Sequence, residues 1–210
     1  MDYTLDTGTK MWWPTPVLRR IWRNHDRYDD DLRQIILEKE SVSKGMHKSN
    51  EGGWHSDEDL LIWDSAAITM FQRWIIQAFN ELSEFTSGGK SFDGKLELNA
   101  WANVNRQGNY NISHTHPDCV WSGVYYVDVG DTPSKAHPLS GAIEFLDPRA
   151  GCEMTIAPGI PFGMRKTITP VSGEMIMFPS WIRHSVHPYL GATPRISIAF
   201  NVRVHFLTDS

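Results

Sequence analysis

The spacing of apolar residues changes near residue 95, and this change constrains the fold more than any other feature of the chain. Before it, apolar residues recur at helical spacing, as between Ile68 and Leu82. After it, apolar and polar residues alternate, as in the segment 96–105, which is the period of a strand with one buried face. We therefore predict a chain with a helical first part and a β second part.

Two helices are predicted in the first part. One would begin near the acidic run 29–31, because acidic side chains stabilise a helix N-terminus. The other would begin near Asp64 or Ser65 and stop before the segment Ser87-Gly88-Gly89. Aromatic side chains dominate core burial, so the tryptophans of this part are assigned to the core rather than to a ligand site. They are Trp12, Trp13, Trp22, Trp54, Trp63 and Trp74.

Short alternating segments separated by turn signals fill the second part. The candidate strands are 96–105, 123–129, 142–146, 152–157, 174–178 and 195–206. Many short strands with such turns are typical of a β sandwich or barrel. In the first of them one face should pack, while the other carries Asn103 and Asn105, either as pocket residues or as hydrogen-bonded amides of the barrel wall. We predict one domain over 1–210, with a helical part at 1–94 and a β core at 95–210.

Composition narrows the classes of function and location. A net charge of -5 and a pI near 6.0 provide no basic surface, so nucleic acid is not an expected partner. The two cysteines, Cys119 and Cys152, form neither a CxxC motif nor a disulfide framework, which fits a reducing compartment. The N-terminus is acidic and no long apolar run occurs. We expect a cytoplasmic protein that is neither secreted nor membrane-spanning; the sequence leaves a homodimer open.

Three histidines and one arginine form the candidate chemical site. His114 and His116 stand at i and i+2, so on an extended segment their side chains share one face about 7 Å apart. His184, from a distant strand, would complete a metal-binding face. Arg195 opens a later alternating run, and its planar guanidinium suits the carboxylate of an acid. A metal face with a carboxylate clamp suggests an oxygenase. His25, His47, His55, His137 and His205 lack a partner at ligand spacing and are assigned structural or surface positions.

Several motifs together carry a family resemblance over most of the chain, from about Trp12 to Val204. They are the segment 49–56 (SNEGGWHS), His114-Thr115-His116-Pro117, Ser122-Gly123-Val124-Tyr125-Tyr126, Asp147-Pro148-Arg149, the Pro-x-x-Gly turn at 170–173 followed by Phe178-Pro179-Ser180 and His184, and the segment 195–201 (RISIAFN). The chain resembles the Fe(II)/2-oxoglutarate-dependent oxygenases, and more narrowly a small oxygenase family of phages and bacteria. This resemblance implies a mainly β, double-stranded β-helix (jelly-roll, cupin-like) core buttressed by the N-terminal helices.

The resemblance also implies roles for individual residues. His114 and His184 match the iron-binding histidines, and Arg195 matches the arginine that grips the distal carboxylate of 2-oxoglutarate. Ser197 would assist Arg195 from the same strand face. Tyr126 lies where related enzymes often place a tyrosine on the cosubstrate, with Tyr125 facing the other way. Asn103 is counted with these cosubstrate residues. Arg149 is either a substrate contact or a turn-stabilising partner of Asp147.

The second metal ligand is where this sequence departs from the family pattern. His116 stands where most of these enzymes have an aspartate or glutamate, and the usual set is two histidines and one carboxylate. His116-Pro117-Asp118 offers a competing frame, in which His116 and Asp118 bind the metal. We favour His114 and His116, because the narrower family has the pattern HxHP and Pro117 would interrupt strand geometry in the second frame.

The expected function is that of a non-haem Fe(II)- and 2-oxoglutarate-dependent dioxygenase, which hydroxylates a small-molecule or peptide substrate with molecular oxygen and releases succinate and CO2. Two alternatives are a three-histidine, cupin-type dioxygenase that does not use 2-oxoglutarate, and a non-catalytic binding module stabilised by metal. Fold and cofactor do not specify the substrate.

Overall fold

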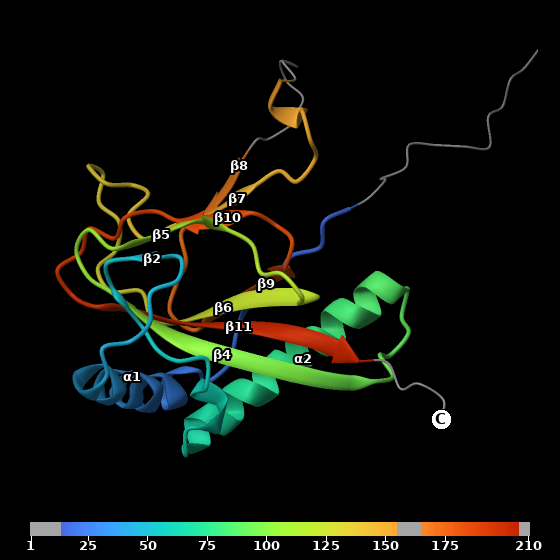
Figure 1. The fold of residues 1–210 in the computed structure, drawn as a ribbon, viewed down its shortest axis with the longest axis horizontal. Helices are drawn as coiled ribbons and strands as arrows, with labels where there is room; N and C mark the ends of the chain where they lie inside the picture. Colours follow the sequence, from blue (N-terminus) through green and yellow to red (C-terminus); the bar gives the residue numbers. More distant parts are fainter. Residues whose placement is uncertain (1–13, 155–164, 206–210) are drawn as a thin grey trace, which may run out of the picture.

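The computed structural model describes residues 14–154 and 165–205. Two antiparallel β-sheets face each other, and the two helices lie against the outer face of the larger sheet (Figure 1). Within the described residues the larger sheet has the strand order β1-β9-β6-β11-β4-β3 and the smaller sheet the order β2-β5-β10-β7-β8. The strands are β1 (Leu18–Ile21), β2 (Asn50–Glu51), β3 (Trp54–His55), β4 (Lys95–Asn105), β5 (Tyr110–His114), β6 (Trp121–Asp128), β7 (Ile143–Leu146), β8 (Arg165–Ile168), β9 (Glu174–Pro179), β10 (His184–Val186) and β11 (Arg195–His205).

The two long strands β4 and β11 lie side by side in the larger sheet and confirm the predicted alternation. They pair antiparallel along their whole length, from Arg195 opposite Asn105 to His205 opposite Lys95. Their apolar side chains, such as Ala102 and Ile198, belong to the core between the larger sheet and the helices. The alternate side chains therefore face the smaller sheet, which places a polar row in the interior of the jelly roll.

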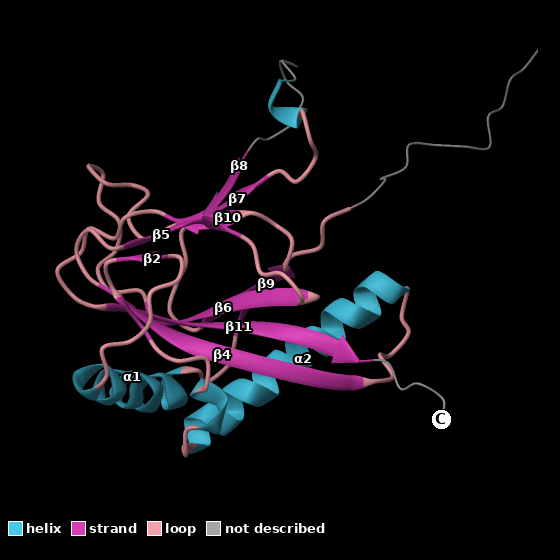
Figure 2. Cartoon of the chain, viewed as in Figure 1, coloured by secondary structure: helices cyan, strands magenta, loops and turns pink. Residues whose placement is uncertain are grey.

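The helices are α1 (Asp26–Val42) and α2 (Ala66–Ser87), which Figure 2 shows beneath the larger sheet. The start of α2 is as predicted, because the Ser65 hydroxyl accepts a hydrogen bond from the amide of Ala67 at 3.1 Å. Its end is also as predicted, since Gly88 takes the left-handed conformation with φ 71°.

The predicted start of the first helix near residue 29 is wrong, because α1 already begins at Asp26. Asp29 lies one turn later and is buried. Its carboxylate accepts hydrogen bonds from the Tyr125 hydroxyl and from His25 Nδ1, each at 2.6 Å. Asp29, which reads as a helix start, therefore ties α1 to β6 through the buried Tyr125, while His25 binds it from the residue just before the helix.

Other elements differ from the predicted strands in small ways. The strand expected at 152–157 is wrong at its start, because Cys152–Met154 forms a 3-10 turn, η2, and the rest lies outside the described residues. Another 3-10 turn, η1, covers Leu60–Ile62. The part expected to be helical, 1–94, also contributes β1, β2 and β3 to the two sheets. Trp22, Trp54, Trp63 and Trp74 are buried in the core as predicted, whereas Trp12 and Trp13 lie outside the described residues.

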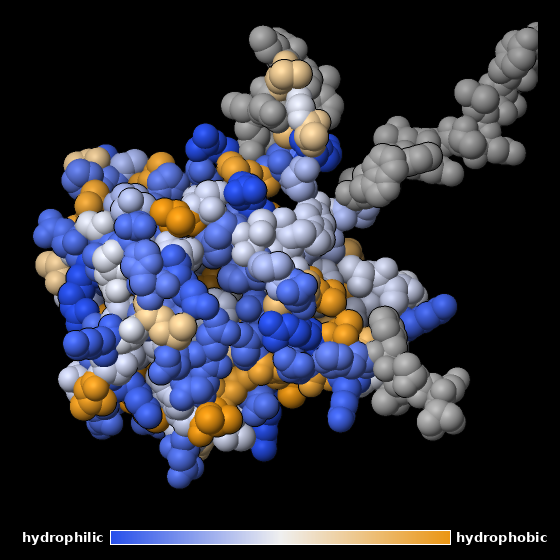
Figure 3. Space-filling view, in the orientation of Figure 1, coloured by the Kyte–Doolittle hydropathy of each residue, from blue (hydrophilic) through white to orange (hydrophobic). Residues whose placement is uncertain are grey.

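The surface is mainly polar. Figure 3 shows hydrophilic side chains over most of one face, interspersed with smaller groups of apolar side chains. Among the described residues, neither helix has the length and apolar character needed to cross a membrane.

Candidate active site

Three histidine rings meet between the sheets, on the side formed by the smaller sheet. His114 ends β5, His184 begins β10, and these two residues pair directly across the antiparallel ladder. His116 follows β5 by two residues. The ring centroids of His114 and His184 are 4.3 Å apart, and His116 lies 5.0 Å from the first and 5.2 Å from the second. One nitrogen from each ring lies within 4.8 Å of the other two, so the three can hold one metal ion.

Backbone carbonyls fix the orientation of two of these rings. The Nδ1–H of His114 donates to the carbonyl of Ile112 at 2.7 Å, and that of His184 donates to the carbonyl of Ile182 at 3.0 Å. A carbonyl can only accept, so Nε2 of each ring keeps its lone pair. Metal-binding histidines are usually oriented by such a bond from the other ring nitrogen.

Burial keeps the three imidazoles neutral. It lowers the pKa of His114, lowers that of His116 to about 4 with a further contribution from neighbouring His114, and lowers that of His184 to about 3. Metal ions bind neutral imidazole, so all three lone pairs are available at neutral pH.

The same cavity collects the residues that were predicted to bind the cosubstrate. Asn103 on β4, Tyr126 on β6, and Arg195 and Ser197 on β11 line it together with the three histidines. Ser197 pairs with both Asn103 and Tyr126 across the sheet, so these three form one row next to Arg195. Tyr125 faces the other way and packs in the core beneath α2, as expected.

Three other candidates lie outside this cavity. Asn105 is buried but does not line it, which matches the wall alternative. Arg149 pairs with Asp147 through two contacts of 2.9 and 2.5 Å, which matches the turn-stabilising alternative. Asp118 is exposed at a turn position with φ 63° and takes no part in the histidine group.

Arg195 is a buried cation in need of an anion. It is 2% exposed, and within the described part of the chain no carboxylate forms an ion pair with it. Its guanidinium lies 5.1 Å from the Tyr126 ring centroid and donates to the Ser197 hydroxyl at 3.5 Å. Burial lowers its pKa, which is the direction expected for a desolvated cation. Burying a charge without a partner is costly, so the position suits an anionic ligand.

Unpaired polar atoms surround Arg195 in the same cavity. Arg195 Nε, the Tyr126 hydroxyl and Asn103 Oδ1 are all buried and have no hydrogen-bond partner among the described residues. Buried polar groups are nearly always satisfied, so three such atoms lining one cavity indicate a polar ligand. Arg195 Nε and the Tyr126 hydroxyl can donate to a dicarboxylate such as 2-oxoglutarate, and the three neutral imidazoles fit Fe(II).

Comparison with known families agrees with this geometry. Residues 99–201, which span β4 to β11, match the family described as "Putative 2OG-Fe(II) oxygenase". The chain is a 2OG-Fe(II) oxygenase. Its cofactors are accordingly Fe(II) and 2-oxoglutarate, as the sequence motifs implied. No curated protein matches the chain.

Solved structures confirm the double-stranded β-helix fold of the oxygenase. A prolyl-4-hydroxylase from Pseudomonas putida aligns with TM-score 0.62 and 14% identity, over 90% of this chain and 92% of that one. A prolyl hydroxylase from Trichoplax adhaerens, in complex with a hypoxia-inducible-factor peptide fragment, aligns with TM-score 0.60 and 12% identity, over 90% and 83%. HygX from Streptomyces hygroscopicus, with nickel and 2-oxoglutarate bound, aligns with TM-score 0.59 and 12% identity, over 93% and 85%.

Ser180, which belongs to the Phe178-Pro179-Ser180 motif but was given no role of its own, joins the two halves of the histidine group. Ser180 lies between β9 and β10, and its carbonyl accepts from the amide of His116 at 3.0 Å. Its own amide donates to the carbonyl of Val120 at 3.2 Å, and its hydroxyl donates to the carbonyl of Cys119. Ser180 is 3% exposed. These bonds hold the loop that carries His116 against the turn that precedes His184.

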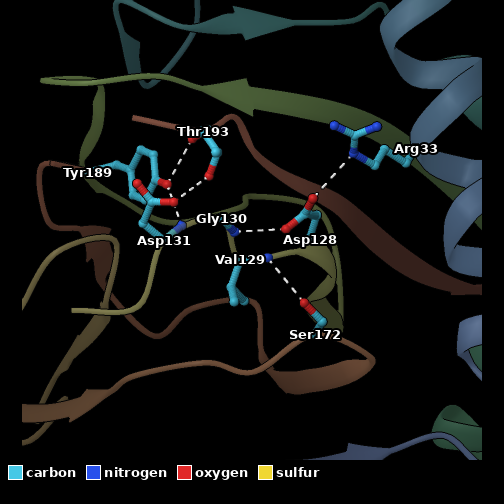
Figure 4. A network of polar contacts seen from close by, with 8 residues as sticks. All are labelled: Arg33, Asp128, Val129, Gly130, Asp131, Ser172, Tyr189 and Thr193. Atoms are coloured by element: carbon cyan, nitrogen blue, oxygen red, sulfur yellow. Dashed lines mark hydrogen bonds and ion pairs between the residues drawn. The ribbon is translucent and has the colours of Figure 1, made fainter. Parts of the chain in front are cut away.

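Figure 4 shows a second polar network, which includes Asp131, Tyr189 and Thr193. The Tyr189 hydroxyl accepts from the amide of Asp131 at 2.7 Å and donates to the carbonyl of Thr193 at 2.8 Å. The Thr193 hydroxyl donates back to the carboxylate of Asp131 at 2.7 Å. Gly141 packs so closely that an added Cβ would lie 3.2 Å from Arg195 Cδ. Any side chain larger than that of glycine at position 141 would therefore press on Arg195.

Proposed function

We propose that His114, His116 and His184 hold the Fe(II) of this oxygenase, and that Arg195, Tyr126, Ser197 and Asn103 bind 2-oxoglutarate beside it. The enzyme then hydroxylates an organic substrate. The observation that carries this proposal is a buried arginine, without a carboxylate partner in the described residues, in the same cavity as three neutral imidazoles. The arginine lacks an anion, which 2-oxoglutarate would supply, and the imidazoles lack a metal ion, which Fe(II) would supply.

In this proposal the residues of the protein bind 2-oxoglutarate and orient it. The guanidinium of Arg195 grips the distal carboxylate of 2-oxoglutarate, and its fork geometry fixes the orientation of that group. The hydroxyls of Ser197 and Tyr126 lie in the adjoining row, where they accept or donate to the same ligand. When bound, Fe(II) and 2-oxoglutarate supply the oxidation: one atom of O2 enters succinate as CO2 leaves, and the other enters a substrate C–H bond.

An anaerobic titration tests this function against a three-histidine dioxygenase that works without 2-oxoglutarate. Adding 2-oxoglutarate to the Fe(II)-loaded protein should produce a saturable metal-to-ligand charge-transfer band in the visible spectrum. Succinate, which lacks the keto group, is the matched control and should produce none. In air, the loaded protein should convert 2-oxoglutarate to succinate. Absence of the band at saturating 2-oxoglutarate, in a protein shown to contain iron, would contradict the proposal.

The choice of His116 over Asp118 is tested by three variants. His116→Asp recreates the two-histidine, one-carboxylate set and should retain iron and part of the succinate formation. His116→Ala should bind iron poorly, because in the wild type His116 Nε2 lies 3.4 Å from His184 Nε2, so that both can reach one ion. Asp118→Asn should match the wild type, because its side chain is exposed. Iron content and succinate are measured on the same samples; equal losses in Asp118→Asn and His116→Ala would favour the competing frame.

We further propose that residues 1–210 form a single oxygenase domain located in the cytoplasm. Pairing of β1, β2 and β3 into the two sheets supports the first statement, because the N-terminal part completes both layers. The low cysteine content, two in 210 residues, supports the second.

A further inference from the structure

A cleft of about 310 Å³ lies beside the histidine group, on the other side of the same chain segments. It is lined by Thr115, Leu146, Asp147, Pro148, Trp181 and Arg183. Thr115 separates His114 from His116, and Arg183 directly precedes His184. Adjacent residues of an extended chain point to opposite sides. The cleft and the metal face are therefore separated by one layer of backbone at the rim of the cavity.

The cleft carries one unneutralised charge, and that charge is positive. Arg183 is exposed and forms no ion pair with any described residue. The other charged lining residue, Asp147, is already held by Arg149, which lowers the pKa of its carboxyl to about 2. A guanidinium that is free in a cleft is a ready partner for a carboxylate.

An exposed tryptophan lies next to this arginine. Trp181 is 55% exposed, whereas the other six tryptophans in the described segments are each only 6 to 8% exposed. The chain therefore buries this side chain type everywhere else that the structure describes. Large exposed aromatic side chains in a cleft are typical of binding sites, because a ring offers much contact area with few rotatable bonds.

From these observations we infer that the cleft anchors the substrate, and that the substrate is an acidic peptide whose carboxylate pairs with Arg183 while a neighbouring apolar group packs on Trp181. The inference rests on the proposed function, since it gives the substrate class for that same site. The cleft adjoins the metal face across one layer of backbone, so a bound peptide has to cross only a few extended residues, each about 3.5 Å long. The acidic residue should therefore lie two or three positions from the oxidised one.

The test uses the Fe(II)-loaded full chain with 2-oxoglutarate, O2 and three matched peptide libraries. The libraries are identical except for Glu, Gln or Lys at a fixed position, and oxidised peptides are detected by a gain of one oxygen atom in mass. The wild type should oxidise Glu peptides about tenfold more efficiently than Gln peptides. Arg183→Glu should reverse the order and favour Lys peptides. Arg73→Glu, the same charge change on the exposed face of α2, should keep the wild-type order.

A second variant probes the aromatic partner. Trp181→Ala should reduce oxidation of Glu and Gln peptides in the same proportion, because it removes packing area but no charge. Equal oxidation of the three libraries by the wild type would overturn the inference, and so would a protein that forms succinate but oxidises no peptide. Failure of the underlying function has a different signature, the absence of the charge-transfer band with 2-oxoglutarate alone.

Discussion

Replacing His184 by alanine is expected to lower Fe(II) affinity by more than about 100-fold, because removal of even a residue that only orients a ligand costs roughly 10- to 100-fold. The pairing of His184 with His114 across the ladder and its Nδ1 bond to the carbonyl of Ile182 support a role as a ligand whose position is fixed. Isothermal titration with Fe(II) under nitrogen measures the affinity. Succinate formation by the iron-treated variant should fall to the level of a blank without enzyme.

The matched control is His137→Ala, the same change at an exposed histidine outside the cavity. It should leave both iron binding and succinate formation at wild-type values. Circular dichroism and a melting curve establish that His184→Ala is folded, since the residue is 5% exposed and its removal leaves a gap. A folded His184→Ala protein with wild-type iron affinity would show that the metal binds elsewhere.

Replacing Arg195 by leucine should weaken 2-oxoglutarate binding by at least about 30-fold, because truncating one partner of a buried, charge-assisted pair costs roughly 2 to 5 kcal/mol. Iron affinity should remain nearly unchanged, since Arg195 does not belong to the histidine group. Titration of the Fe(II)-loaded variant with 2-oxoglutarate, followed by the charge-transfer band, measures the effect. The variant removes a buried charge that lacks a partner in the described residues, so we expect the protein without ligand to be no less stable than the wild type.

Arg195→Lys serves as the conservative comparison. Lysine keeps the positive charge but loses the planar fork, so its 2-oxoglutarate affinity should fall between those of the wild type and Arg195→Leu. Unchanged 2-oxoglutarate affinity in Arg195→Leu would contradict the proposal that Arg195 binds the carboxylate of 2-oxoglutarate. Equal losses in the two variants would show that fork geometry, rather than charge, determines binding.

The sequence predicted the parts of the fold that depend on long periodic segments. Alternation over 96–105 and over the strand opened by Arg195 is strong enough to identify β4 and β11 and to place Asn103 and Ser197 on the inner face. Ser65 and Gly88 likewise mark the ends of α2 by local chemistry. These signals are short-range, so they can be read from neighbouring residues alone.

Other features depend on contacts between distant segments. β10 has three residues and β2 and β3 have two each, too short for any period to be visible. The start of α1 was placed late because Asp29 reads as a helix start, whereas its charge is used by Tyr125, 96 residues away. Trp101 lines the cavity beside His116 at a centroid distance of 5.8 Å, and only its place on the face of Asn103 hinted at this. Ser180 was part of a motif, but its role could not be predicted, because each of its hydrogen-bond partners lies far away in the sequence.

The hydrogen bonds of Ser180 determine how much of the proposed iron site is ordered before iron binds. They join the two chain segments of the histidine group through protein atoms alone, so the loop of His116 is ordered before any metal arrives. In small domains that fold around their metal, the ion must first organise the chain, and its loss unfolds them. Here the histidines that we propose as ligands are held in place by bonds that need no ion. Uptake of iron then incurs little loss of chain entropy, and an ion lost to oxidation can be replaced without refolding.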